Sequence, residues 1–143
     1  MITPPQLEGW DRWTGNDPFE DSTGPFFMKL DPENGKHLSA FLCQDRHMNG
    51  GGFMHGGMLM SFADYALFVI AHDELREQHS VTLSCQTDFV SGAAPIGKIV
   101  YADGEVIKAT RSLVFVRGQT YVDDTVLTTF TGILKKTKPR EQS

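Results

Sequence analysis

Asp64 is the residue of this sequence whose setting most strongly suggests chemistry. Every residue from Met58 to Ala71 is apolar or aromatic except Ser61 and Asp64. Removing an ionised carboxylate from water is costly, so an aspartate in such a segment is generally paired, hydrogen-bonded or used in a reaction. We therefore take Asp64 as a candidate general base. A structural aspartate that reaches water or a backbone amide is the alternative interpretation.

The residues ahead of this segment could bind a negatively charged oxygen. His55-Gly56-Gly57 stands where a helix would begin, behind a glycine-rich loop that opens at Asn49. The first N–H groups of a helix have no partner within it, and this end carries a partial positive charge, which suits an oxyanion or a polarised carbonyl. Glycine also lets another molecule approach the backbone closely. A tight turn from strand to helix would equally explain the glycines.

The separation of these two groups predicts a site shared between subunits. Gly56 and Asp64 are eight residues apart, which is about 12 Å along a helix that rises about 1.5 Å per residue. A general base must come within about 3 Å of its partner, or reach it through one water. One helix therefore cannot place both groups on one carbonyl, whereas two antiparallel copies across a two-fold axis can. We expect a homodimer with two such sites.

The elements that must position these residues indicate an α+β fold. The 143 residues suffice for one domain. A helix is expected over residues 56–72, and because it is apolar on nearly all sides we expect it to be covered on every face. Turns are expected at Asp103-Gly104 and at Gly118. Alternating apolar residues and turn signals predict strands over residues 25–31, 36–43, 81–89, 96–102, 105–109, 111–117 and 121–135. In one of these strands four apolar side chains should share a face, namely Val81, Leu83, Cys85 and Phe89.

The composition of the two ends sets the predicted boundaries. Residues 1–24 are rich in proline, glycine, aspartate and tryptophan, which predicts an irregular or short-helical lead-in. We expect its Trp10, Trp13 and Phe19 to pack on the body. The folded domain is placed at residues 25–136 and a flexible tail at 137–143.

Charge and cysteine content exclude several classes. With 18 acidic and 13 basic residues, the chain lacks the broad basic footprint of a nucleic-acid binder. No arrangement of cysteine and histidine fits a standard metal site, so no metal is expected. The N-terminus has no signal-peptide pattern, no segment is long enough to span a bilayer, and Cys43 and Cys85 suit a reducing compartment. We expect a soluble, cytoplasmic protein.

The segment from Asn49 to Asp64, N-G-G-G-F-M-H-G-G-M-L-M-S-F-A-D, resembles a family signature. It is similar to that of the hotdog-fold thioesterases, in the phenylacetic-acid-pathway (PaaI-like) branch. That branch shows an asparagine six residues before an H-G-G and an aspartate nine residues after the histidine. Asn49, His55 and Asp64 match both spacings. The resemblance covers roughly residues 25–136.

This resemblance implies a fold and an activity. The hotdog fold is a curved antiparallel sheet wrapped around a long central helix, dimerised through that sheet and often assembled into a homotetramer. The implied activity is hydrolysis of an acyl-CoA thioester, with no cofactor except the coenzyme A of the substrate. By the same resemblance, Asp64 would activate water as general base, or would act as the nucleophile and form a mixed anhydride.

The resemblance also assigns roles to further residues. The Gly56 N–H would polarise the carbonyl and hold the oxyanion, and Asn49 would orient the water or the thioester. Thr82 would fix the water near Asp64, and His55 would fix the start of the helix. Candidates for contacts with substrate and the phosphates of coenzyme A are Gly57, Lys108, Arg111, Arg117 and the basic tail Lys135–Arg140.

Two alternatives belong to other classes. A hotdog hydratase or dehydratase pairs its acid with a histidine, and here no histidine follows Asp64 before His72. A non-catalytic acyl-CoA sensor would keep the pocket but would have no need of Asn49 and Asp64 together. Both are weaker interpretations than a thioesterase.

Overall fold

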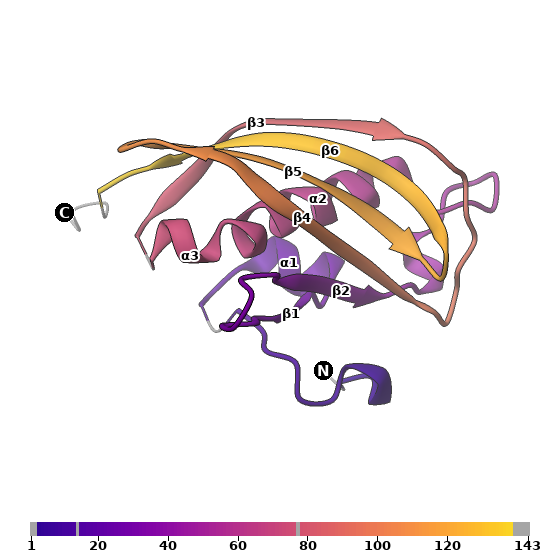
Figure 1. Ribbon diagram of the computed structural model, residues 1–143. Coiled ribbons are helices and arrows are strands. Elements are labelled where there is room, and N and C mark those ends of the chain that lie inside the picture. The colour runs from indigo at the N-terminus through magenta and orange to yellow at the C-terminus, as the bar shows by residue number, and fades with distance from the viewer. Residues whose placement is uncertain (1–2, 14, 77, 139–143) are drawn as a thin grey trace.

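Six antiparallel strands curve around one long helix in the computed structural model (Figure 1). The structure describes residues 3–13, 15–76 and 78–138. Its helical elements are η1 (Pro5–Leu7), α1 (Pro18–Thr23), η2 (Asp45–His47), α2 (Gly56–Ile70) and α3 (His72–Leu75). Its strands are β1 (Phe27–Lys29), β2 (Leu38–Leu42), β3 (Ser80–Phe89), β4 (Ile99–Ala109), β5 (Leu113–Val122) and β6 (Thr125–Lys136). The predicted α+β class is confirmed.

The strand order places β3 at an edge of the sheet. The order is β1-β2-β4-β5-β6-β3, and all neighbours are antiparallel. The concave face covers α2, whose apolar side chains form the main core with residues of β2, β4, β5 and β6. Within this sheet β3 has one neighbour, β6, so one side of its backbone is unpaired. The edge strand runs alongside the helix that carries Asp64.

The turns expected at Asp103-Gly104 and at Gly118 are wrong. Both glycines lie inside long strands, where Gly104 of β4 stands directly opposite Gly118 of β5. A Cβ on Gly104 would collide with the Arg117 carbonyl oxygen and with Ile70 of α2. These glycines therefore mark close packing of strand on strand and of sheet on helix, rather than a reversal of the chain.

The predicted face of β3 is also wrong, because the strand contains a β-bulge. The pairing of β3 with β6 shifts between Thr82 and Ser84, which leaves Leu83 as the extra residue. Cys85 packs against the core, whereas Val81 and Leu83 are exposed. Period-two alternation fails across a bulge. The shift leaves Thr82 turned toward α2.

One stripe of α2 is open, although the sequence predicted a helix covered on every face. Gly57, Met60 and Asp64 are exposed at spacings of three and four residues, which places them on one side of the helix. The rest of α2 is largely buried in the core. In the part of the chain that the structure describes, no helix is both long and apolar enough to cross a membrane.

The lead-in is part of the folded body. Leu7 is fully buried in a second core with Phe27 of β1, and Trp10 packs against that core as predicted. Asp11 forms a β-bridge with Met28. Trp13 and Phe19 are exposed, so the prediction that they pack on the body is wrong. Of the tail predicted at 137–143, residues 139–143 lie outside the described part of the chain.

Candidate active site

Among the described residues, the first turn of α2 presents one backbone N–H without a partner. His55 is the N-cap, and its Nδ1 accepts a hydrogen bond of 2.8 Å from the Gly57 N–H. The Met58 and Leu59 N–H groups donate to the His55 carbonyl. The Gly56 N–H has no acceptor among the described residues. His55 thus satisfies the Gly57 N–H and leaves the Gly56 N–H available to a ligand.

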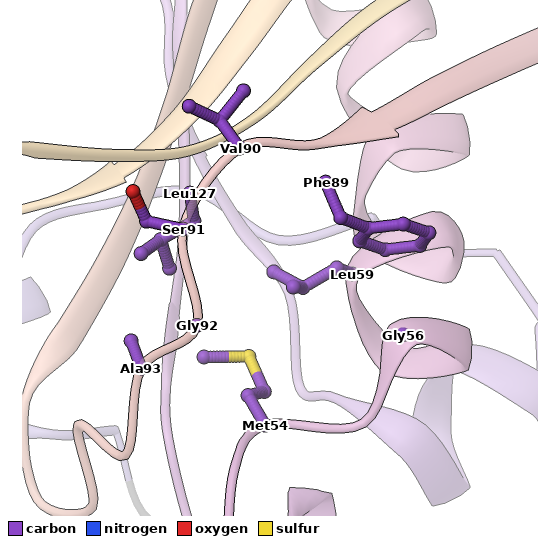
Figure 2. A pocket seen from close by; sticks show the side chains of 9 residues that line it. All are labelled: Met54, Gly56, Leu59, Phe89, Val90, Ser91, Gly92, Ala93 and Leu127. Atoms are coloured by element: carbon purple, nitrogen blue, oxygen red, sulfur yellow. The ribbon is translucent and has the colours of Figure 1, made fainter.

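An apolar pocket of about 260 Å³ opens at Gly56. Figure 2 shows the Phe89 ring beside the first turn of α2, facing Leu59 and Met54, with residues 90–93 forming another wall. A Cβ on Gly56 would lie 3.1 Å from the Phe89 ring, so a larger residue at position 56 would crowd it. The whole lining comprises Met54, Gly56, Leu59, Phe89, Val90, Ser91, Gly92, Ala93 and Leu127. A polarising N–H at the mouth of an apolar pocket suits a carbonyl that carries an apolar group.

Asp64 is hydrogen-bonded to Thr82 across the gap between α2 and β3. The Thr82 hydroxyl donates to Asp64 Oδ1 at 2.6 Å, a short distance typical of a hydroxyl bound to a carboxylate. Asp64 is exposed in the single chain, so the desolvation cost inferred from its apolar neighbours in sequence does not arise there. Those neighbours point into the core, while Asp64 lies on the open stripe. The hydrogen bond fixes the carboxylate and leaves it facing outward.

Asn49 organises the glycine loop. Its side-chain oxygen accepts hydrogen bonds from the Gly51 N–H at 2.9 Å and the Phe53 N–H at 3.1 Å. Its backbone N–H donates to the Phe53 carbonyl. Asn49 thus joins the two ends of the loop. The residue that follows the loop is also fixed, because the His55 N–H donates to the His47 carbonyl. The oxygen of Asn49 is thus engaged in the loop, and its amide nitrogen is the group left for a ligand.

A single chain does not bring Asp64 to the Gly56 pocket. Asp64 is absent from the lining of that pocket. The two residues are separated by eight positions of continuous α-helix, or about 12 Å of rise. Asp64 lies beside Thr82 near the start of β3, whereas Gly56 lies beside Phe89 at its end.

The basic residues proposed for coenzyme A lie elsewhere on the chain. Arg117 of β5 pairs with Glu105 of β4, and its Nε donates to Glu105 Oε1 at 2.6 Å. Lys108 is near the end of β4, and Arg111 lies between β4 and β5. None of the three lines the Gly56 pocket. Of the basic tail, Arg140 lies outside the described residues.

A histidine cluster near α3 is explained by hydrogen bonding. His37, His72 and Asp73 place their ligand atoms within 4.8 Å of one another. His37 Nδ1 accepts a hydrogen bond from the Asp31 N–H, so its Nε2 carries the proton that it shares with Asp73 at 3.0 Å. This contact lowers the pKa of Asp73. A protonated Nε2 offers no lone pair to a metal, so the cluster is a tie between the β1–β2 turn and α3.

Some residues that line the pocket were not predicted as site residues from the sequence. The segment 90–93 follows β3 without regular structure, yet it lines the pocket. Phe89, which was expected only to share a face with Val81, Leu83 and Cys85, is 55% exposed and lines the pocket. The signal that could have found these residues is the run of small residues Ser91-Gly92-Ala93, which leaves space beside a helix start.

Residues 51–129 match the family model of the thioesterase superfamily, which is more than half of the chain. The chain belongs to this superfamily. It is 27% identical over 127 residues to a Pseudomonas aeruginosa protein named as a putative esterase, a match that spans 88% of this chain and 93% of the other.

Solved structures of other proteins share the hotdog fold of this chain. A mutant form of the phenylacetic acid degradation protein PaaI from Thermus thermophilus is 25% identical, with a TM-score of 0.71 over 85% of this chain and 100% of that one. A hypothetical thioesterase from Streptococcus pneumoniae, crystallised with coenzyme A, is 15% identical, with a TM-score of 0.71 over 85% of this chain and 93% of that one. The predicted resemblance and fold are confirmed.

Proposed function

We propose that this protein is an acyl-CoA thioesterase that hydrolyses its substrate to a free acid and coenzyme A. The observation that carries the proposal is Gly56, which lines an apolar pocket and whose N–H has no acceptor among the described residues. Membership of the thioesterase superfamily and the coenzyme A in a structure of the same fold support the choice of substrate. A polarised carbonyl at Gly56 with its apolar group in the pocket is the arrangement that thioester hydrolysis needs.

The proposed reaction uses Asp64 as general base. Its carboxylate takes a proton from a water that Thr82 and Asn49 help to orient, and the water oxygen attacks the thioester carbon. Negative charge develops on the carbonyl oxygen, where the Gly56 N–H donates a hydrogen bond. When the tetrahedral intermediate collapses, the C–S bond breaks and the thiolate of coenzyme A takes the proton held by Asp64. No metal or other cofactor is required by these steps.

We propose that the two halves of the site come from different subunits of a homodimer. β3 is an edge strand whose Val81 and Leu83 are 46% and 56% exposed, and it borders the open stripe of α2. An exposed apolar edge is a natural place for a second strand. If a second β3 pairs antiparallel about Cys85 and Gln86, midway between Thr82 and Phe89, the Asp64 of one chain moves toward the Gly56 of the other.

The pocket supports an aromatic or medium-length acyl group as substrate. A volume of about 260 Å³ with an apolar lining gives room for such a group and offers no charged side chain to it. The basic residues from Lys108 onward remain the candidates for the phosphates of coenzyme A. Arg117 is a weaker candidate than Lys108 and Arg111, because Glu105 already neutralises it.

Thiol release from a panel of acyl-CoA esters tests this function. The panel contains acetyl, hexanoyl, palmitoyl, benzoyl and phenylacetyl esters, each assayed with the wild type, Asp64→Asn and Asp124→Asn. Asp124 is an exposed carboxylate in the β5–β6 turn and serves as the matched control. We expect turnover of at least one ester to fall at least about a hundredfold in Asp64→Asn, the scale of losing a positioned base, and to persist in the control. Tight binding without turnover by the wild type would instead identify an acyl-CoA sensor.

A further inference from the structure

One wall of the apolar pocket is the irregular segment that follows β3 (Figure 2). Backbone hydrogen bonds fix both ends of this segment. At one end the Val90 N–H donates to the Leu127 carbonyl at 2.8 Å, and at the other the Met54 N–H donates to the Ala93 carbonyl at 2.8 Å. Between these ends, Gly92 has no hydrogen-bond partner among the described residues. The middle of the wall therefore depends on packing for its position.

The ring of Phe53 packs against this middle part. A Cβ on Gly92 would lie 3.3 Å from the ring, and the three atoms nearest to that position all belong to Phe53. The ring thus covers the side of Gly92 on which a side chain would stand. Phe53 does not itself line the pocket, so its ring contacts the wall from outside. The other side of the ring faces solvent, because Phe53 is 53% exposed.

Asn49 fixes the backbone that carries this ring. The Phe53 N–H donates to Asn49 Oδ1 at 3.1 Å, and the Phe53 carbonyl accepts from the Asn49 N–H at 2.7 Å. The glycines between the two residues add little packing, since a Cβ on Gly50 or Gly52 would have no atom within 4 Å. The glycine loop therefore presents one large side chain, and two hydrogen bonds hold its backbone beside the pocket wall.

We propose that Phe53 is a specificity-determining residue of the thioesterase site, which keeps the pocket wall in place before the acyl group binds. The inference rests on the proposed function. A wall that is already ordered loses no further conformational entropy when an acyl group contacts it, so binding to it is tighter. An acyl group too short to reach the wall gains nothing from this order. The ring of Phe53 therefore favours the larger acyl groups that the pocket admits.

The size of the effect follows from the residue that the ring covers. Without the ring, the backbone at Gly92 is free to move, and glycine has more conformational freedom to lose than any other residue. Fixing this one residue again on binding should weaken binding of a larger acyl group about tenfold. The loss should appear in KM with kcat unchanged, because the substitution leaves Gly56 and Asp64 as they are.

The kinetics of Phe53→Ala, Phe53→Tyr and Phe19→Ala test this role. Each variant and the wild type are assayed with the shortest acyl-CoA ester that the wild type hydrolyses and with the ester that it hydrolyses best. Phe19 is the matched control, because it is 61% exposed and does not line the pocket. Phe53→Ala should raise KM for the best ester about tenfold and leave the shortest ester unaffected. Phe53→Tyr keeps the ring, so it should restore the wild-type KM, and Phe19→Ala should not change it.

Gly92→Ala tests the same contact from the wall. The new Cβ would lie 3.3 Å from the ring, so either the ring or the wall must give way by a few tenths of an ångström. Because Asn49 fixes Phe53, the wall should shift and KM for the best ester should rise. In Phe53→Ala the space is open, so adding Gly92→Ala should raise KM no further. Additive effects of the two substitutions would show that they act independently, which overturns the role given to this contact.

The outcomes separate the inference from the function on which it rests. A rise in KM that is confined to the larger ester, and that Phe53→Tyr does not show, supports the role of Phe53. Equal changes for both esters, no change for either, or a fall in kcat instead overturns that role and leaves the thioesterase standing. A wild type whose best ester is also its shortest overturns it as well. No hydrolysis of any acyl-CoA ester by the wild type overturns the proposed function and the inference together.

Discussion

A mixture of two inactive variants should recover activity if each site is built from two chains. Asp64→Asn removes the base, which costs about 10² to 10⁴ in rate. Gly56→Pro removes the proposed oxyanion donor, which costs about 10² to 10³. Proline is favoured at the first position of a helix, and His55 before it has φ −64° and ψ 134°, a conformation that a residue preceding proline adopts readily. The helix start should therefore survive while the N–H is lost.

The expected recovery of activity follows from how the two kinds of chain pair into dimers. In a dimer of one chain of each kind, one site carries both defects and the other carries none. Random pairing of equal amounts makes about half of the dimers mixed, so about a quarter of wild-type activity should return. The two variants are refolded together from urea and assayed with the best ester of the panel, and the same variants refolded separately and then combined are the reference.

Gly56→Ala is the control for crowding at position 56. Gly56→Ala crowds the Phe89 ring, 3.1 Å from the new Cβ, but keeps the N–H. It should retain far more activity than Gly56→Pro, which separates the donor from crowding. Activity in the co-refolded mixture no greater than in the reference would show that Asp64 and Gly56 do not act across a subunit boundary. The shared-site model would then be rejected, whatever the oligomeric state.

Three further predictions follow from individual contacts. Thr82→Val removes the 2.6 Å hydrogen bond to Asp64 without changing side-chain shape; we expect kcat/KM to fall about tenfold or more and the free energy of unfolding in urea to fall by at most about 3 kcal/mol, since hydrogen bonds to charged groups contribute about 1.5 to 3 kcal/mol. Gly104→Ala should lower the free energy of unfolding in urea by about 1 to 3 kcal/mol or more through overpacking, whereas Gly50→Ala, with no atom near its Cβ, should not. Glu20→Gln should raise Tm relative to wild type at pH 9 but not at pH 4.5. Glu20 of α1 is half-buried, and burial, followed by the effects of Asp17, Asp64 and Asp21, raises its pKa from 4.5 to about 8 on folding. Stability present below pH 4.5 is therefore lost progressively up to about pH 8; equal Tm values at pH 9 would contradict this.

Sequence reasoning found the parts of the site that depend on residue type at fixed spacing. The helix start at His55 and the position of Asp64 nine residues later follow from local pattern. Thr82 was named only from the family resemblance, and its hydrogen bond to Asp64 joins a strand to the helix. The separation of Asp64 from Gly56 also follows, because helical rise is constant. These features need no knowledge of how the strands pair.

Features that depend on contacts distant in sequence could not be predicted. Gly104 and Gly118 look like turn residues in the chain, but they face each other across two strands, and Gly104 leaves space for Ile70. The bulge at Leu83 changes which side chains of β3 face the core, and no residue type in this strand predicts a bulge. The end of α1 is bound by Arg46, which donates to the carbonyls of Ser22, Thr23 and Gly24, and no local pattern predicts this contact.

The glycines under the helix also limit how this protein could change its substrate. Near the C-terminal end of α2, contact between helix and sheet is so close that a Cβ on Gly104 would collide with Ile70 and a Cβ on Gly132 would collide with Leu67. Substitution at these glycines cannot create space, because glycine has no side chain to shorten. Space for a larger acyl group can be gained at the N-terminal end of the helix, where Met54, Leu59 and Phe89 line the pocket and still have atoms to lose. Evolution or design toward longer substrates would therefore concentrate its substitutions at these three positions and leave the sheet as it is.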